Sequence, residues 1–424
     1  MRGSQKTCLI LALQTNTFCE DKIMKKITLL CLPFFFAACG TIQNISQGDS
    51  NQNVQSGTET AFLFATDYSS SGQLMTSDDT AASLTNTGVT GLGSSAIIKF
   101  FDGKLYVLSD GFSRLSLNNV QILDPSNSYR TIAEWSTGDG TNPQDIVVSG
   151  DTAYISLYNP DTVDNLDSSG NPGDLIVMDL NTGLISQSIS FHDYLNADGD
   201  LNADAGPMVL VGSTLYVAIQ DLQNDFSQNT FGKIAVIDTT TNAVTSVITL
   251  QGRDPVDLVA STTANKLYVA DEAPYDFSLG NFDTTTAYGG LEVIDLSTLQ
   301  SVALLADETL GGYIERLASG DKKVFAVASQ LDSTTFAFSS TILSMDEDNT
   351  DTSAVSNFVT GSEDVREIVV DSVAQLWVSR RAINATDGSA SDPEVDAFDI
   401  DTGAQVGTSL IPTVAVTSIT FGTL

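Results

Sequence analysis

The chain has 424 residues and carries 53 acidic against 18 basic side chains, a formal net charge of −35. Such a charge disfavours nucleic acid and anionic membrane surfaces as partners, and it favours cations, basic proteins and neutral glycans. With a single histidine, His192, the chain also lacks the ligands for a histidine-bound copper or haem centre, and a Ser-His-Asp triad could only be built around that residue.

The first recognisable segment in chain order is a signal peptide. Residues 24–26 read Met-Lys-Lys, residues 27–36 are an apolar run, and residues 37–40 read Ala-Ala-Cys-Gly. The apolar run is much shorter than the ~20 residues that a membrane span needs. We therefore expect residues 1–38 to be removed. Because Met24 begins a complete signal, we also expect translation to start there, with residues 1–23 outside the true protein.

The end of this segment resembles the lipobox of bacterial lipoproteins, with small residues ahead of Cys39 and with Phe36 where that family usually has Leu. The resemblance implies that Cys39 receives a lipid and becomes the first mature residue. Gly40 is not the Asp that retains related enteric lipoproteins in the inner membrane, so the resemblance implies an outer-membrane location, facing the periplasm or the medium. The alternative is an ordinary secretory signal with an incidental cysteine.

The mature chain then begins with a polar segment. Residues 39–59 are rich in Thr, Gln, Asn, Ser and Gly and cannot bury a core, so they are expected to form a flexible tether. The other cysteines, Cys8, Cys19 and Cys31, precede Cys39, which excludes a disulfide or a cysteine metal site in the mature domain. Five basic and two acidic residues leave with residues 1–38, so the mature net charge is −38.

Residues 60–424 have the pattern of an all-β fold. Short β-branched and aromatic runs are separated by Gly, Asn, Asp and Pro, without a helical period. The runs recur as a set, most clearly over residues 232–270, with shorter copies beginning at Leu175, Leu291 and Val395. This set resembles the YVTN-type β-propeller repeat, which implies the propeller fold but says little about function.

The repeat predicts seven blades. Innermost strands are expected near Ile97, Ile146, Val209, Leu258, Leu317, Ile368 and Ile419, at spacings of 49 to 63 residues that suit four-stranded blades. The last of them lies close to the C-terminus, so residues 61–67 and 73–77 are expected to complete the seventh blade. Pairing of the N- and C-terminal strands would close the ring and remove exposed sheet edges, giving a monomeric domain.

The long connections are all expected on one face. If the strands of each blade are counted outward from the channel, the long connections follow either the second or the fourth strand: 159–171, 192–207, 221–231, 272–288, 330–339 and 382–393. Loops usually carry binding, so this face is the expected functional surface, although neutral loop growth would give the same pattern.

Charged residues are expected to gather on the same face, and we predict ligand binding by Arg253, Arg316, Arg366, Arg380, Arg381, Asp145, Asp257 and Glu315. Arginine offers a planar fork for carboxylate, phosphate or sugar groups. The alternative is that these arginines pair with neighbouring acids such as Asp271, Asp364 and Glu367 in a charged rim. The lysines, among them Lys99 and Lys104, are expected on the opposite face.

One loop has the pattern of a calcium site. Asn196, Asp198, Asp200, Asn202 and Asp204 place oxygen ligands at every second position, and Ca²⁺ requires six to eight hard oxygens. The segment resembles the Asp-rich calcium loops of integrin-type propellers and dockerin-like repeats, but Leu201 replaces a turn glycine and no Glu closes an EF-hand. A solvated polar turn is the alternative.

These features predict a membrane-anchored lipoprotein whose propeller loops bind a protein or a glycan in the envelope or outside the cell, and nothing in the sequence requires an enzyme. The alternative is a calcium-dependent, lactonase-like hydrolase at the channel mouth, with Asp145, Asp257 and Glu315 holding the ion and an arginine orienting the substrate.

Overall fold

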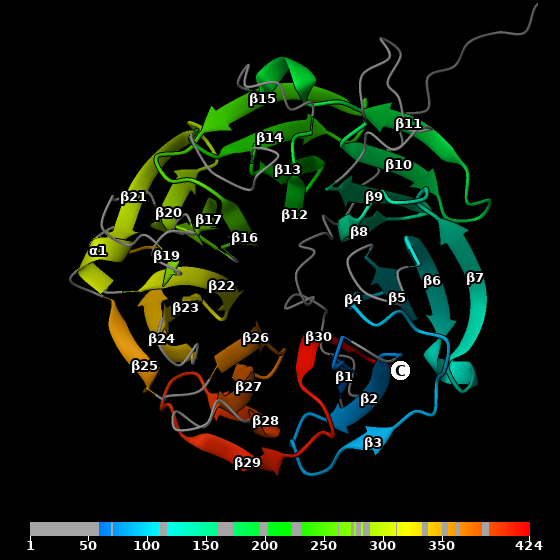
Figure 1. The fold of residues 1–424 in the computed structure, drawn as a ribbon, viewed down its shortest axis with the longest axis vertical. Coiled ribbons are helices and arrows are strands. Elements are labelled where there is room, and N and C mark those ends of the chain that lie inside the picture. The colour runs from blue at the N-terminus through cyan, green and yellow to red at the C-terminus, as the bar shows by residue number, and fades with distance from the viewer. Residues whose placement is uncertain are drawn as a thin grey trace, which may run out of the picture. The chain divides into compact units, whose positions relative to one another are not determined.

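The computed structural model describes residues 59–68, 71–110, 117–158, 173–195, 202–222, 230–261, 263–272, 275–276, 281–282, 289–310, 312–332, 338–349, 355–360, 364–383 and 390–424. Within them the chain forms seven four-stranded antiparallel sheets arranged as blades around a central channel (Figure 1). The all-β, seven-bladed propeller predicted from the repeat is therefore confirmed.

Every blade uses its strands in the same order from the channel outward. The innermost strands are β4 (Ala96–Phe101), β8 (Pro143–Ser149), β12 (Ala205–Val211), β16 (Pro255–Ala260), β22 (Tyr313–Gly320), β26 (Asp364–Val370) and β30 (Val416–Gly422). The second strands are β5 (Lys104–Ser109), β9 (Thr152–Leu157), β13 (Thr214–Ile219), β17 (Lys266–Asp271), β23 (Lys323–Leu331), β27 (Gln375–Ile383) and β1 (Thr60–Ala65). All seven predicted starts fall in these innermost strands.

Two further strands complete each blade, and the fourth is more exposed than the third. The third strands are β6 (Asn119–Asp124), β10 (Leu175–Asp179), β14 (Lys233–Asp238), β20 (Gly290–Asp295), β24 (Phe338–Asp346), β28 (Ala390–Asp399) and β2 (Gln73–Asp78). The fourth are β7 (Arg130–Ser136), β11 (Ile185–Ile189), β15 (Ala243–Thr249), β21 (Gln300–Ala306), β25 (Ser356–Thr360), β29 (Gln405–Leu410) and β3 (Thr85–Asn86). Short elements between strands are η1 (Pro125–Asn127), η2 (His192–Tyr194), α1 (Asp307–Leu310) and the β18 (Tyr275–Asp276) and β19 (Asn281–Phe282) hairpin.

The two ends of the propeller meet in the seventh blade, which has the order β3-β2-β1-β30. Thr60 pairs with Gly422 and Leu63 with Ile419, so the C-terminal strand lies on the channel and the N-terminal strands complete its sheet. The predicted closure is confirmed, and β30 gains a partner that it would otherwise lack.

The core is divided among the blade interfaces. In the described part of the chain there are seven buried clusters, and each joins one blade to the next around the ring. The middle of the second strand supplies a large ring to most of these interfaces, as with Tyr268 and Trp377, both fully buried. Because a blade is apolar on both faces, it is stable only between two neighbours.

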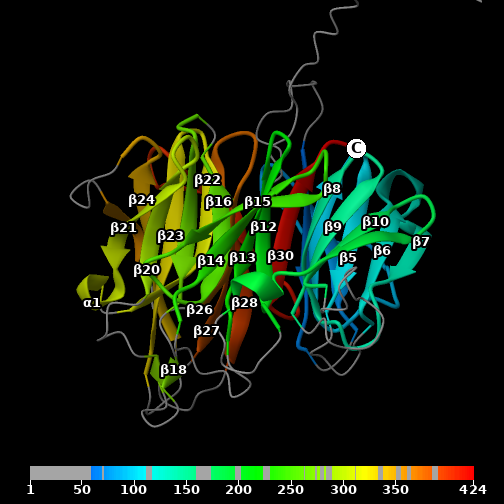
Figure 2. The same ribbon diagram turned by 90° about the horizontal axis from the view of Figure 1, so that it is seen from above.

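The two faces of the propeller differ (Figure 2). Connections from first to second strand and from third to fourth strand are tight, as at Gly150 and Gly212, which adopt a φ of +60°. We call this side the short-turn face and the opposite side the mouth face. The mouth face carries the long connections, including the β18–β19 hairpin. Parts of all six predicted long connections lie outside the described residues, including the whole of 159–171.

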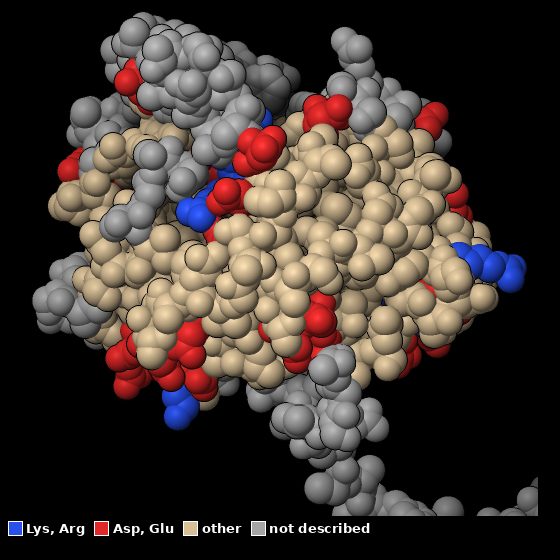
Figure 3. Space-filling model, turned by 90° about the horizontal axis from the view of Figure 1, so that it is seen from below, with Lys and Arg blue, Asp and Glu red and all other residues tan. Residues whose placement is uncertain are grey.

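Many acidic residues belong to turns. An Asp ends the third strand of every blade, and in six blades one of its carboxylate oxygens accepts from the backbone N–H two residues later; these six are Asp78, Asp124, Asp179, Asp238, Asp295 and Asp399. Such turns are a standard use of Asp. Acidic side chains accordingly lie mainly toward the rims of the flank drawn in Figure 3. Turn chemistry therefore explains part of the acidic excess without a ligand.

Among the described residues, no helix is long and apolar enough to cross a bilayer.

Ring closure can be tested at Phe62 on β1. Its ring is fully buried and stacks on Phe100 of the first blade at 5.3 Å between centroids. We expect Phe62→Ala to lower the free energy of unfolding by about 3–5 kcal/mol, because it leaves a cavity in the interface between the seventh and first blades. Urea denaturation measures this. Ile132→Ala, on the exposed face of β7, is the control, and equal losses in both variants would contradict the closure.

Candidate ligand site in the propeller channel

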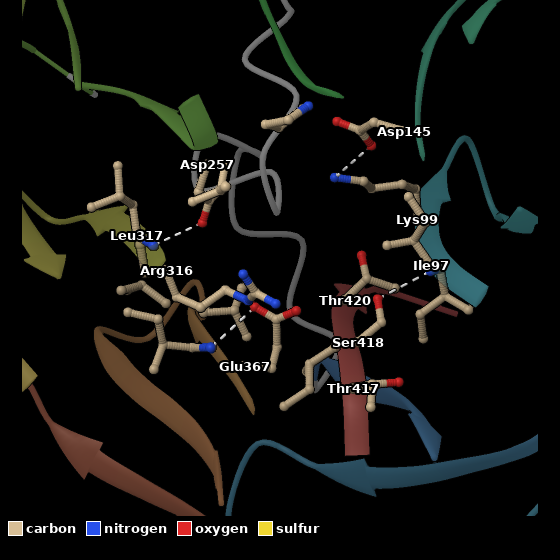
Figure 4. Close-up of a pocket in the computed structure, with 18 of the residues that line it drawn as sticks. Ile97, Lys99, Asp145, Asp257, Arg316, Leu317, Glu367, Thr417, Ser418 and Thr420 are labelled. Atoms are coloured by element: carbon tan, nitrogen blue, oxygen red, sulfur yellow. Dashed lines mark hydrogen bonds and ion pairs between the residues drawn. The ribbon is translucent and has the colours of Figure 1, made fainter. Parts of the chain in front are cut away.

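Each blade contributes an equivalent side chain to the channel. The register of the first and second strands aligns the aliphatic residues Ile98, Ile146, Met208, Leu258, Leu317, Ile368 and Ile419, which point into the blade interfaces. The residues just before them form what we call the channel ring: Ile97, Asp145, Pro207, Asp257, Arg316, Glu367 and Ser418 (Figure 4). Four of its seven positions are therefore charged.

β-Bulges shape the mouth end of this ring. The pairing register shifts just ahead of the ring residue in β8, β12, β16, β22 and β26, as between Ile314 and Arg316 and between Val365 and Glu367. A bulge inserts one extra residue and re-aims its side chain. As a result Arg366, next to the ring residue Glu367, lines the channel mouth together with Arg316.

Two acids of the ring hold neighbouring blades together. Asp257 Oδ1 accepts from Leu258 N at 2.8 Å, and Oδ2 accepts from Leu317 N of the next blade, also at 2.8 Å. Asp145 repeats this geometry, with Oδ2 accepting from Met208 N at 2.8 Å. Ser418 Oγ accepts from Ile98 N at 3.1 Å and plays the same part where the ring closes. We call these contacts the channel staples.

Basic side chains balance the acids. Lys99, one step further along β4, does not stay on the short-turn face as expected, because its Nζ lies 3.4 Å from Asp145 Oδ1 inside the channel. Arg316 Nη1 donates to Glu315 O at 2.7 Å and Nε donates to Arg366 O at 3.3 Å. Burial disfavours the charge of Arg316, but Glu315, Glu367 and Asp257 outweigh it and raise its pKa. Figure 4 shows Lys99 and Asp145 facing Arg316 and Glu367 across the channel.

Two acids that line the channel cavity, Glu367 and Asp257, have raised pKa values, as does Glu315, which lines neither cavity. Burial, partly offset by Arg316, raises the pKa of Glu367 to about 7 and that of Asp257 to about 6. Burial also raises the pKa of Glu315, whose Oε1 accepts from Ser329 Oγ. Glu367 Oε1 accepts from Ile368 N at 3.0 Å, which leaves Oε2 available to a ligand. Glu367 is therefore the acid of the ring that is least committed to the fold.

Two adjoining cavities, which share Gln144 and Arg316 in their walls, follow from this arrangement. The first has about 260 Å³ and runs along the channel past Lys99, Asp145, Asp257, Arg316 and Glu367. The second has about 240 Å³ and lies at the mouth, where Tyr68, Asp110 and Gln144 join Arg316 and Arg366. Both are close to the low end of the roughly 300–1,000 Å³ typical of small-molecule sites, and both are rich in hydrogen-bonding groups. The geometry suits a small polar ligand.

The structure brings together only some of the predicted binding residues. Asp145, Asp257 and Arg316 line the channel, and Arg366 reaches its mouth. Arg366 and Arg381 both contact Asp364, at 2.5 and 2.9 Å. These two ion pairs form part of the charged rim that was given above as the alternative to ligand binding by these arginines.

Arg380 and Arg253 lie elsewhere. Arg380 pairs with Glu394 at 3.3 Å and with the buried Asp396, and it lines a small void between blades. The guanidinium of Arg253 lies 5.8 Å from the ring centre of Phe231. Sequence reasoning did not select Lys99 or Glu367 as binding residues, nor Tyr68 and Gln144. Lys99, Glu367 and Gln144 share one signal, a polar residue within an innermost strand, whereas Tyr68 follows β1 and carries no such signal.

The predicted calcium loop is described only in part. Asn196, Asp198 and Asp200 lie outside the described residues, as does Cys39. Asp204 is buried and its Oδ2 accepts from Leu222 N at 2.8 Å, while Asn202 is half-buried. Among the described residues no group of three His, Cys, Asp or Glu side chains is placed to hold a metal ion. Calcium binding stays a prediction.

A group of acidic side chains lies in and beside the fourth blade. Glu292 Oε1 accepts from Gln251 N and Gly252 N, and the fully buried carboxyl of Asp271 lies near that of Glu292. Burial, reinforced by Glu292 and Asp254, holds the pKa of Asp271 well above its usual range. Burial also raises the pKa of Asp254 to about 7 and, together with Asp254 and Glu315, that of Glu272. Asp254, Asp271 and Glu272 therefore bind a proton more tightly in the folded protein than in the unfolded chain.

These acidic side chains predict a pH dependence of stability. Between about pH 4 and 7 the folded state keeps protons that the unfolded chain has lost, so the free energy of unfolding falls as pH rises through this range. Asp271→Asn cannot ionise, so it removes the cost of charging a buried carboxyl beside Glu292. We expect the stability of this variant relative to wild type to increase from pH 5 to pH 8 in urea denaturation. Asp401→Asn, at an exposed turn, should follow wild type, and parallel pH profiles for all three proteins would contradict the raised pKa of Asp271.

The channel staples predict a graded loss at Asp257. Asp257→Ala leaves the Leu258 and Leu317 N–H groups without their acceptor, and we expect a loss of about 1–3 kcal/mol in unfolding free energy. Asp257→Asn keeps one acceptor oxygen and should lie between Ala and wild type. Asp401→Ala should change stability by less than about 0.5 kcal/mol. Equal stability of Asp257→Ala and Asp401→Ala in chemical denaturation would show that the channel staples do not stabilise the fold.

Comparison with known proteins agrees with the fold and adds little on function. No family model matches the sequence, and no curated protein matches it. A crystal structure of a putative 6-phosphogluconolactonase from Bacteroides fragilis has a TM-score of 0.58 and 12% sequence identity, and the match covers 88% of this chain and 100% of that one. A second structure of that name, from Bacteroides uniformis, has a TM-score of 0.56 at 11% identity and covers 87% and 100%. At these identities the likeness shows the seven-bladed propeller alone.

Proposed function

We propose that the protein is a lipid-anchored binding propeller that holds a neutral sugar unit of a glycan in its channel mouth. The observation that carries this proposal is the pair of adjoining cavities, whose walls combine the donors Lys99 and Arg316 with acceptors on Glu367 and Gln144. Sugar hydroxyls both donate and accept, so such a wall can satisfy them without a change in net charge.

The individual groups support a sugar better than an ion. Glu367 Oε2 can accept from a hydroxyl, Gln144 adds an amide, and Arg316 donates along a fixed fork. Tyr68 leaves 48% of its surface exposed at the mouth and offers an apolar face to a sugar ring. Lys99 and Arg316 nearly balance Asp145, Asp257 and Glu367, so neither an anion nor a cation finds an uncompensated partner in the channel.

A hydrolase at the same site is the second candidate function. It is favoured by Glu367, because a carboxyl with a pKa of about 7 can both give and take a proton near neutral pH. The two propellers compared above are named for lactone hydrolysis. A calcium-dependent form is less well supported, since Asp145 and Asp257 already use both oxygens to accept backbone N–H groups.

The lipid anchor at Cys39 and the outer-membrane location belong to the same proposal and rest on the lipobox and on Gly40. A tether of about 20 residues would keep the propeller within reach of the bilayer while leaving it free to engage a glycan.

The proposal predicts selective binding of neutral saccharides. The full chain should bind neutral sugars from a panel that also contains uronic acids and amino sugars, measured by calorimetry. Loss of stacking and hydrogen bonding in Tyr68→Ala and Gln144→Ala should each weaken binding by about tenfold, equivalent to about 1.4 kcal/mol. Ile132→Ala, whose side chain is 47% exposed on the flank, is the matched control for Tyr68.

A different outcome would separate the two candidate functions. Hydrolysis of lactones that is lost in Glu367→Gln would favour the enzyme, whereas tight binding of charged sugars alone would refute the neutral-glycan proposal.

A further inference from the structure

The chain enters the propeller on the face opposite the channel mouth. β1 runs from the short-turn face to the mouth face, because Thr60 at its start pairs with Gly422 and Ala65 at its end pairs with Val416. Tyr68, three residues beyond β1, already lines the mouth cavity. The strand therefore spans the thickness of the blade.

A specific contact fixes this starting point. Glu59, the residue before β1, accepts through Oε2 from Ser372 N at 3.0 Å and from Ser372 Oγ at 2.8 Å. Ser372 lies in the tight turn between β26 and β27, on the short-turn face of the neighbouring blade. The chain ahead of residue 59 must consequently leave from that face.

The length of the tether limits which face of the propeller can lie toward the bilayer. Residues 39–59 form a polar segment whose root-mean-square span as a flexible chain is roughly 25 Å. To bring the mouth to the bilayer, the tether would have to pass β2 and β3, about 10 Å, and then climb a flank of about 20 Å or more. That path exceeds the relaxed span even before the long connections are added. With the short-turn face toward the bilayer, no such stretching is needed.

We infer that the anchored propeller turns its short-turn face to the membrane holding Cys39 and its channel mouth away from it, so that the glycan is presented from solution or an opposing surface. The inference rests on the proposed lipid anchor. It narrows the partner to a glycan that is not itself part of the anchoring leaflet, such as a soluble saccharide or a polymer lying beyond it.

Site-specific labels in vesicles test this orientation. Cys39 is the last cysteine of the chain, so a new cysteine in the lipidated protein takes a fluorophore at one position. Val373→Cys marks the short-turn face and Leu117→Cys the mouth face, and both side chains are exposed. Vesicles carry a quencher on the lipid headgroup. We expect the Val373 label to be quenched at least about threefold more than the Leu117 label, because the two faces lie about 20 Å apart.

A second pair of labelled positions and a variant with a longer tether provide two further tests of the orientation. Leu184→Cys and Tyr194→Cys mark the two faces within the second blade and should repeat the difference. About 40 added Gly and Ser residues in the tether should reduce the difference, because the span then allows either face to reach the bilayer. Equal quenching of both faces in vesicle-bound protein would overturn the orientation and leave the anchor intact. Failure of the protein to bind vesicles would overturn the anchor, and with it this inference.

Discussion

Every blade of this propeller has two apolar faces, and both can be buried only if the ring of blades is closed. The seven buried clusters follow from this constraint. Each consists of side chains from two neighbouring blades. Closure depends on pairing β1 with β30, strands from opposite ends of the domain. It also dictates where the tether begins, because a second strand of a blade must start on the short-turn face. The orientation inferred for the anchored protein is therefore a consequence of closure.

The channel shows how the same positions serve structure and binding. A side chain of the channel ring can accept hydrogen bonds from the backbone N–H groups of its own blade and of the next blade. Otherwise it keeps an acceptor available to the cavity. Asp145 and Asp257 are committed to the staples, whereas Glu367 bonds only to Ile368 N within its own strand. Buried acids that are fully hydrogen-bonded by backbone are poor ligands for anything else. Under the proposed function, this division assigns ligand recognition to Glu367, Arg316 and the mouth residues.

The sequence predicted the fold well because propeller blades are local in the chain. The recurring set of short β-branched and aromatic runs, separated by turn residues, located every innermost strand and the closing strands. The site was harder to predict, because its members come from blades separated by hundreds of residues and depend on register. Lys99 shows this, since its strand position indicated the short-turn face, yet its long side chain reaches Asp145. The bulges before Arg316 and Glu367 likewise cannot be predicted from the pattern of hydrophobic residues.

The structure divides the acidic residues into two groups with opposite pKa shifts. The Asp residues that end the third strands are exposed or half-buried, and the hydrogen bonds of their turns lower the pKa of Asp238, Asp295 and Asp399, so these three stay ionised and keep the surface hydrated. Asp257, Glu367 and Asp254 behave oppositely, because burial raises their pKa toward neutrality. Net charge alone pointed to cations and basic proteins as readily as to neutral glycans. In the proposed function, placement favours neutral glycans, since the acids that line the channel cavity lie beside Arg316 and Lys99.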